Sequence, residues 1–257
     1  MSDAVAQATS HTPKAERMLS IDVLRGFDMF WIAGGEEIVN GLDEAMKGPK
    51  PEGGAPVAEV ASSGDGFFHG LLETVSTQLK HVQWEGFRFY DLIFPLFLFL
   101  IGVSIVFSLS RIVREEGKAA AHRRVFKRFV IMYLVGIFYY GLFRNHWTLP
   151  DGSGGIRLVG VLQRLALGYL FGSLLFLHLK EKGLAIALAV ILVGYWAIMS
   201  FVPAPGEPHV SFEPGRNIAN YIDMHFVPGR MNDKTPDGNG GFFRWDPEGA
   251  LSTIPAV

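Results

Sequence analysis

The strongest constraint on this chain is an apolar stretch, residues 92–110, that contains no charged side chain and reads LIFPLFLFLIGVSIVFSLS. A helix needs about 20 mainly apolar residues to cross the hydrocarbon core of a bilayer, and this stretch meets that requirement. The composition agrees, because 49% of the residues are hydrophobic and only 19% are charged, which exceeds the apolar content that a soluble core requires. The sequence therefore predicts an integral membrane protein rather than a soluble domain.

Four further segments have the composition of membrane spans. They are residues 19–39, 129–143, 158–179 and 184–202. The 129–143 segment is short, but it is bracketed by Arg128 and Arg144, whose stems can reach the two interfaces. The sequence turns apolar again at residues 251–257. We therefore expect an all-α fold, a polytopic transmembrane helix bundle with about five spans plus the start of a sixth.

The orientation follows from the distribution of Lys and Arg, because short loops rich in these residues stay on the cytoplasmic side. Residues 111–128 hold seven of them, and the N-terminal tail and the turn at residues 180–182 hold two each. We therefore expect a multi-pass protein of the cell inner membrane with residues 1–18 as a cytoplasmic tail. Residues 19–257 would form the membrane domain. Its outer-face loops would be residues 42–89, 145–157 and 203–252, and the first of these contains a possible amphipathic helix.

Several functional classes are excluded or disfavoured by composition. The formal net charge of −2 provides no basic surface of the kind that nucleic-acid binding needs. There is no cysteine, which excludes disulfides, thiolate nucleophiles and Cys-ligated metals. No HExxH or comparable metal spacing occurs, so we expect no metal. The expected partners are membrane lipid and small molecules, and a homo-oligomer is compatible with the sequence.

Ionisable side chains inside the expected spans require a partner or a function, because an unpaired charge in hydrocarbon is costly. Arg164 lies about two turns into the 158–179 segment and needs a carboxylate or an anionic ligand. Its partner could be one of four acidic residues, namely Asp22, Asp28, Glu36 or Asp91. Such a pair could merely join helices, or Arg164 could bind a substrate. Asp22 and Arg25 stand three residues apart, which favours a structural pair.

A second group of polar residues lies where the most apolar span begins. The segment HVQWEGFRFYDLIFP places His81 and Trp84 just before that span and Asp91 at its start. An imidazole, an indole and a carboxylate would therefore meet at one membrane interface. From spacing alone, a lone His is more often structural, and Trp84 has an ordinary use as an interfacial aromatic residue.

Four segments together carry a more specific signal. They read SIDVLRGFDMFWI, HVQWEGFRFYDLIFPLFLFLIGVSI, IRLVGVLQRLALGYL and DPEGALSTIP. This combination resembles the heparan-alpha-glucosaminide N-acetyltransferase family of membrane acyltransferases, in a bacterial-type member. The resemblance runs from about residue 17 to the last residue. That family carries ten or eleven spans, so this chain is expected to represent only its N-terminal half.

The resemblance implies acetyl transfer from acetyl-CoA, reached from the cytoplasmic side, to the amine of a glucosamine-like sugar on the far side. The catalytic His of the family matches His81, and its carboxylate matches Asp91. The family's interior helix matches the GVLQR element with Gln163 and Arg164, and Arg157 precedes it in the same segment. These three residues, with Trp84 and Glu36, are the expected substrate and cofactor contacts.

The chemistry of amine acetylation agrees with this carry-over. An ammonium group is not a nucleophile, so a base that works near neutral pH must take its proton, and imidazole suits that task. His81 is therefore the expected base, and Asp91 could fix its tautomer. An acetyl-imidazole intermediate is a second possibility that the sequence does not separate from direct transfer.

The sequence also departs from the family pattern and leaves other functions open. The family usually has an Asn near the outer end of its first helix, where this chain has Glu36, and the outer segment before His81 is longer. Acceptor recognition is therefore open. An amino-sugar transporter of the inner membrane is the alternative, in which Arg164, Glu36 and Asp91 would bind or relay rather than catalyse. A third class is an assembly protein whose buried polar residues all pair internally.

Overall fold

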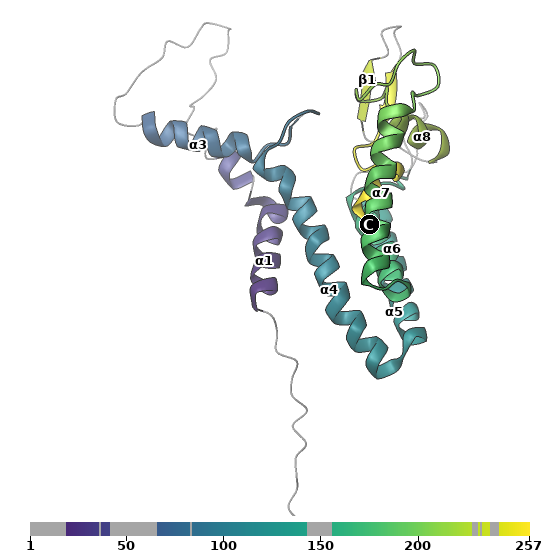
Figure 1. Cartoon of the computed structure of the whole chain (residues 1–257). Helices are drawn as coiled ribbons and strands as arrows, with labels where there is room; N and C mark the ends of the chain where they lie inside the picture. The colour runs from purple at the N-terminus through teal and green to yellow at the C-terminus, as the bar shows by residue number, and fades with distance from the viewer. Residues whose placement is uncertain are drawn as a thin grey trace, which may run out of the picture. The chain divides into compact units, whose positions relative to one another are not determined.

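The computed structural model describes residues 19–35, 37–41, 66–82, 84–142, 156–227, 231, 233–236 and 242–257. Most of these residues are helical, as Figure 1 shows. The chain divides into two compact units, Met1–Phe97 and Leu98–Val257.

The first unit begins with α1 (Leu19–Phe30), which continues into a π-helical turn (Trp31–Gly35). This turn contains a kink at Gly34, so the first expected span is not one continuous helix. The rings of Phe27 and Trp31 make edge-to-face contacts with Phe89, at centroid distances of 6.4 and 5.8 Å. Aromatic contacts of this kind join α1 to the segment that precedes the most apolar helix.

The charged residues of α1 differ in their exposure and in their partners. Asp22 and Arg25 form the expected i,i+3 ion pair, at 3.5 Å, with both side chains exposed. Asp28, in contrast, is fully buried, and neither of its carboxylate oxygens has a hydrogen-bond partner within the described residues. The helix α3 (Gly66–Gln78) follows and confirms the helix expected in the segment before His81.

Two long helices, α4 (Ile93–Glu116) and α5 (Lys118–Leu142), are separated by a single residue, Gly117. Gly117 has a φ of 85° and donates its N–H to the carbonyl oxygens of Ile112 and Val113. This left-handed conformation ends α4 and suits glycine, which lacks a Cβ. The prediction of a loop at residues 111–128 is therefore wrong, because its Ala, Arg, Lys and Glu residues favour helix and extend both helices.

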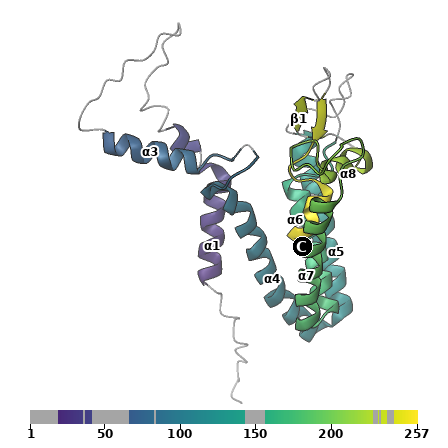
Figure 2. The same ribbon diagram turned by 45° about the horizontal axis from the view of Figure 1, so that its top comes forward.

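The helix α6 (Val161–His178) is the most buried of the long helices of the second unit, and α7 (Glu181–Phe201) follows after a two-residue turn. A core cluster joins α4, α5 and α6 and includes Leu109, Val125 and Tyr169. In both Figure 1 and Figure 2, α5, α6 and α7 run side by side. The helices approach closely at Gly136, where an added Cβ would lie 2.9 Å from the Gln163 side chain.

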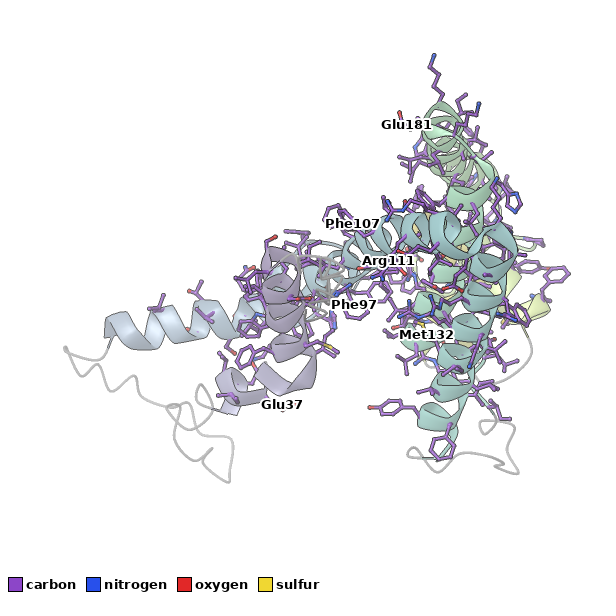
Figure 3. All side chains as sticks on the ribbon, turned by 90° about the horizontal axis from the view of Figure 1, so that it is seen from below. Glu37, Phe97, Phe107, Arg111, Met132 and Glu181 are labelled. Atoms are coloured by element: carbon purple, nitrogen blue, oxygen red, sulfur yellow. The ribbon has the colours of Figure 1, made fainter. Side chains whose placement is uncertain are left out.

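Three helices of the described residues are long and apolar enough to cross a membrane: Phe89–Glu116, Val161–His178 and Glu181–Phe201. The five expected spans are therefore only partly confirmed. The first is interrupted by its kink. Residues 129–142 of the expected 129–143 span lie in α5, whose first half is rich in Lys and Arg, so that its apolar part is shorter than about 20 residues. Apolar side chains such as Phe107, labelled in Figure 3, are exposed, as a membrane environment would permit.

The expected outer segment 203–252 has regular secondary structure in its described residues. It contains α8 (Ile218–Phe226) and two antiparallel strands, β1 (Asp233–Pro236) and β2 (Phe242–Trp245). The all-α expectation holds for the described residues apart from this small two-stranded sheet, which forms because strands joined by a short connection can pair without any helical crossover. The rest of the described fold is helical.

The last described elements are α9 (Ala250–Thr253) and a 3-10 helix (Ile254–Ala256), where the start of a sixth span was expected. The carbonyl oxygens of Ala256 and Val257 lie 3.4 Å from the positions that a Cβ would take at Gly168 and Gly172 of α6. Because these two glycines have no side chain, the end of the described chain can pack closely against α6.

Candidate active site

The loop between α3 and a 3-10 helix (Phe89–Leu92) that leads into α4 is described at residues 79–82 and 84–88. Arg88 holds this loop, because its guanidinium Nη1 donates to the carbonyl oxygen of His81, at 3.1 Å. Gln78 accepts a hydrogen bond from the N–H of Phe89, at 3.2 Å. The loop turns at Gly86, whose φ is 125°. This conformation explains the glycine of the HVQWEG segment, because an L side chain would be strained there.

His81 and Asp91, ten residues apart in sequence, form a hydrogen-bonded pair. The Nδ1 atom of His81 lies 2.8 Å from Oδ1 of Asp91. The imidazole side chain is 69% exposed and the carboxylate is 23% exposed. The ring of Tyr90 meets the imidazole edge to face, at a centroid distance of 4.8 Å. The two predicted catalytic side chains are therefore in direct contact.

The second oxygen of Asp91 has a structural partner. Oδ2 accepts the backbone N–H of Arg88 at 3.0 Å, and the N–H of Asp91 donates to the Arg88 carbonyl oxygen at 3.1 Å. Reciprocal bonds of this kind satisfy the donors at the start of a helix. Asp91 therefore both begins the helix and holds the imidazole.

The hydrogen bond determines what the imidazole can do. A carboxylate oxygen is an acceptor, so Nδ1 of His81 carries a proton that it donates to Asp91, and Nε2 of the neutral ring holds the lone pair. An imidazole in this tautomer can accept a proton at Nε2, and the adjacent carboxylate stabilises the resulting positive charge. The pair has the arrangement of a general base with its orienting carboxylate.

Two other residues, Trp84 and Glu36, were predicted to contact the substrate or cofactor. Trp84 lies in the same loop and its side chain is partly exposed. Its position two residues before Gly86 is compatible with a contact to a bound ligand, which stays a prediction. Glu36 lies outside the described residues.

A second polar cluster lies in the other unit, around Arg157. The Nε of Arg157 donates to Oδ2 of Asp246 at 2.8 Å, and its Nη2 donates to Oδ1 of Asp246 at 2.5 Å. The same Nη2 also donates to Oε2 of Glu248. Arg157 and Asp246 are buried. Because a guanidinium presents its donors in a fork that matches a carboxylate, this is a well-oriented pair.

The carboxylates of this region are poorly hydrated. Burial raises the pKa of Glu248 to about 7, and a hydrogen bond with Asp246 adds to this, while Arg157 opposes it. Burial also raises the pKa of Asp223 to about 6, against the lowering effect of two backbone N–H donors. Those donors belong to Ala250 and Leu251, so Asp223 caps the start of α9.

Gln163 and Arg164 lie at the start of α6, beside this cluster. Gln163 is fully buried, and its Nε2 donates to the carbonyl oxygen of Arg157 at 3.2 Å. Its Oε1 has no hydrogen-bond partner within the described residues. Arg164 donates from Nη2 to the carbonyl oxygen of Ser252 at 2.8 Å. A contact of Arg164 with a carboxylate of the first or second span stays a prediction.

The sequence did not identify the acidic partners of Arg157 as site residues. Asp246 and Glu248 lie 89 and 91 positions beyond Arg157, and no spacing rule joins residues so far apart. The available signal was the DPEG turn itself, which places two acidic residues directly before an apolar segment. A buried arginine in the neighbouring segment would need such partners.

The helices and the first cluster together define a class: a helical membrane protein with an imidazole–carboxylate pair at the start of a membrane helix. The family model described as "Heparan-alpha-glucosaminide N-acetyltransferase, catalytic" matches residues 67–213. The chain belongs to this family. The matched region contains His81, Asp91 and the start of α6, whereas Asp246 and Glu248 lie beyond it.

Two curated relatives carry the same name as the family model. The chain is 26% identical to the Heparan-alpha-glucosaminide N-acetyltransferase of Homo sapiens over 215 residues and 25% identical to that of Mus musculus over 215 residues. Each alignment covers 69% of this chain and 32% of the relative. The chain therefore spans about a third of the length of the curated relatives that it matches.

Proposed function

We propose that this protein is a membrane-embedded acyltransferase that transfers acetyl from acetyl-CoA to the amine of a glucosamine-like amino sugar. The observation that carries the proposal is the contact between His81 Nδ1 and Asp91 Oδ1, at 2.8 Å, within the region that matches the family model. The names of the two relatives support acetyl transfer to a glucosaminide amine.

In this proposal His81 acts as the general base. Its Nε2 takes a proton from the sugar ammonium, and the resulting amine attacks the thioester carbonyl carbon of acetyl-CoA. The new C–N bond forms as the C–S bond breaks, and the proton held by His81 passes to the leaving thiolate. The products are the acetamide and free CoA, with one proton released. Asp91 keeps Nδ1 protonated and stabilises the imidazolium.

The same pair would also support a two-step route. Nε2 of His81 would attack the thioester first and form an acetyl-imidazole, which the amine would then consume. In both routes Trp84 would contact the substrate near the imidazole. Arg157, Gln163, Arg164 and Glu36 would contribute to substrate or cofactor binding.

The proposed orientation places the N-terminus and residues 111–128 in the cytoplasm, since Lys and Arg concentrate there. Residues 42–89, with His81, would face the periplasm, and the protein would lie in the inner membrane. Acetyl-CoA would reach the site from the cytoplasmic side, and the amino sugar from the outer side.

The decisive experiment measures labelled acetyl transfer from acetyl-CoA to a panel of amino sugars in membranes that contain the full-length protein. Loss of a positioned base typically lowers a rate by about 10²- to 10⁴-fold, so His81→Ala should remove most of the activity. Asp91→Asn should have a smaller effect, because an amide oxygen can still accept one hydrogen bond. Trp196→Phe, on the exposed surface of α7, is a control that should retain activity.

The proposal also predicts different effects of the His81→Ala substitution on KM and on kcat. The base acts mainly on the barrier, so the KM for the amino sugar should change little in His81→Ala while kcat falls. A wild-type protein that accumulates free amino sugar in vesicles, but forms no acetylated product, would reject catalysis in favour of transport. An active His81→Ala protein would reject the assigned base.

A further inference from the structure

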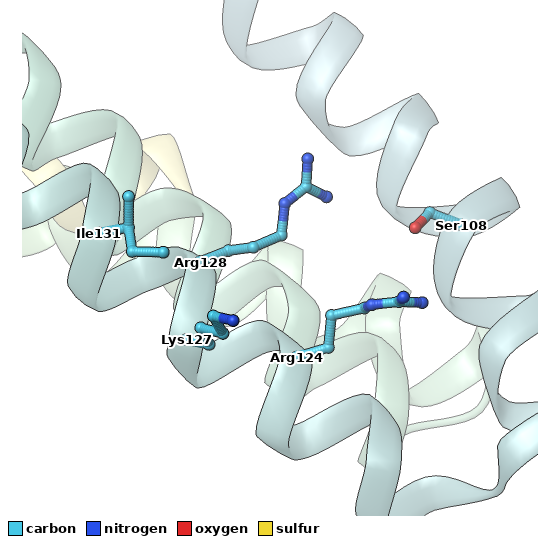
Figure 4. Close-up of a pocket in the computed structure, with 5 residues that line it drawn as sticks. All are labelled: Ser108, Arg124, Lys127, Arg128 and Ile131. Atoms are coloured by element: carbon cyan, nitrogen blue, oxygen red, sulfur yellow. The ribbon is translucent and has the colours of Figure 1, made fainter.

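A surface hollow of about 400 Å³ lies between α4 and α5, at the end of the helices where they are joined by Gly117. Its walls contain Ser108 from α4 and, from α5, Arg124, Lys127, Arg128 and Ile131. The four α5 residues follow the i, i+3, i+4, i+7 spacing that places side chains on one face of a helix. Figure 4 shows the side chains of Arg124 and Arg128 extending from α5 toward α4, which carries Ser108.

The hollow has an excess of positive charge. Three lining residues are cationic, and the one carboxylate paired with them among the described residues is Glu116, 3.8 Å from Arg124. Three positive charges against one negative charge leave +2. The pair with Glu116 is half exposed, and exposed pairs of this length contribute little. The excess charge can therefore attract an anion.

One of the lining arginines, Arg128, contacts an aromatic ring. The guanidinium carbon of Arg128 lies 5.5 Å from the centroid of the Tyr169 ring on α6. A cation–π contact is an electrostatic attraction to the ring face and does not require the N–H donors of the guanidinium to bind an acceptor. The planar set of donors of a guanidinium suits a phosphate group.

We propose that this hollow binds the phosphate groups of an anionic ligand. A volume of about 400 Å³ falls in the range of small-molecule sites, roughly 300–1,000 Å³, so a phosphorylated organic group fits better than inorganic phosphate alone. Arg124 and Arg128 bind the phosphate oxygens, Lys127 adds a point charge, and the hydroxyl of Ser108 donates a further hydrogen bond. Ile131 provides the apolar edge.

Two sources carry this chemistry at the proposed cytoplasmic end of the helices. One is the phosphorylated nucleotide portion of the acetyl donor, and this source alone rests on the proposed function. The other is the headgroup of an anionic phospholipid in the inner leaflet. The phosphate site itself depends only on the geometry and charge of the hollow.

The nucleotide arm of the test uses the full chain in nanodiscs of phosphatidylcholine. Binding of adenosine 3′,5′-bisphosphate, which has no acetyl group, is measured by calorimetry. Arg128→Gln should weaken binding about tenfold, and the combined change of Arg124, Lys127 and Arg128 to Gln about a hundredfold or more. Arg123→Gln removes a charge from the next position along α5, outside the hollow, and should change binding less than twofold.

The lipid arm uses nanodiscs that contain phosphatidylglycerol as well as phosphatidylcholine. Native mass spectrometry then counts the phosphatidylglycerol molecules that stay with the protein. If the lipid is the ligand, Arg128→Gln and the triple variant should lose bound phosphatidylglycerol and Arg123→Gln should retain it. Either arm supports the phosphate site and identifies its source. Since each single variant is also measured, the result does not depend on the folding of the triple variant.

Wild-type-like behaviour of Arg128→Gln and of the single Arg124 and Lys127 variants in both arms would overturn the proposal. The outcome is separate from the acetyltransferase assignment, because neither arm requires turnover. His81→Ala should bind the nucleotide and the lipid as the wild type does. A protein without acetyltransferase activity that still shows Arg128-dependent binding would refute the proposed function and leave the phosphate site intact.

Discussion

The buried cluster around Arg157 yields a prediction with a definite size. Replacing Arg157 by Met keeps most of the side-chain volume but removes the guanidinium that binds both Asp246 and Glu248. Asp246 is fully buried and Glu248 is 21% exposed at the side chain. Removing one partner from a buried ion pair typically costs about 3–5 kcal/mol. We expect a loss of this order for Arg157→Met at pH 8, where Glu248 is ionised.

The effect should depend on pH, and the pKa of Glu248 gives the direction. Burial raises this pKa from 4.5 to about 7, so the folded protein holds a proton that the unfolded chain releases. The contribution of Glu248 to the free energy of unfolding is therefore largest below about pH 4.5. It decreases by on the order of 3 kcal/mol as the pH rises through about 7. Arg157 lowers this pKa, so its removal raises the pKa further. At pH 5 Glu248 is protonated in both proteins, and the loss should be smaller.

The assay is the melting temperature of the full chain in detergent, followed by tryptophan fluorescence at pH 5 and pH 8. For a chain of this size 1 kcal/mol corresponds to roughly 2–4 °C, so Arg157→Met should melt about 6–20 °C lower at pH 8. Adding Glu248→Gln should recover part of this loss at pH 8 and little at pH 5. An equal decrease at both pH values, or no decrease at pH 8, would refute the electrostatic explanation.

Two further predictions concern the loop that carries His81 and the orientation of the chain. Gly86→Ala should destabilise the loop by about 1–3 kcal/mol, because φ is 125° there, and hydrogen exchange at residues 79–88 should accelerate. Gly70→Ala, in α3 where an added Cβ meets no atom within 4 Å, is the control: it should stabilise the helix slightly and should not accelerate exchange in the loop. Single cysteines replacing Ser63 and Ala119 should react with an impermeant reagent from opposite sides of the membrane, and labelling from the same side would reject the proposed topology.

The most apolar helices were predictable because their composition leaves few alternatives. Residues 92–110, and residues 184–201 of the expected 184–202 span, lie within helices that satisfy the length and composition of membrane spans. The 111–128 segment was mistaken for a loop because the distribution of Lys and Arg indicates a side of the membrane and carries no information about secondary structure. Its run KAAAHRR consists largely of good helix formers, and only Gly117 interrupts the helices.

The two polar clusters differ in how far the sequence could predict them. His81 and Asp91 lie ten residues apart in a segment with a recognisable pattern, so their contact could be anticipated. The partners of Arg157 come from an outer segment about 90 positions away, and such pairing depends on tertiary packing that spacing does not encode. The two-stranded sheet was missed because strands of four residues are too short for an alternating pattern to emerge.

The two hydrogen bonds of Asp91 have a consequence for conformational entropy. One carboxylate oxygen binds the imidazole of His81, and the other binds the N–H of Arg88 at the helix start. Immobilising a side chain when a ligand arrives typically costs about 0.5–1.5 kcal/mol. Here the helix start restricts the carboxylate rotamer before any ligand is present. When His81 accepts a proton, the group that stabilises the new charge therefore has little rotational freedom left to lose.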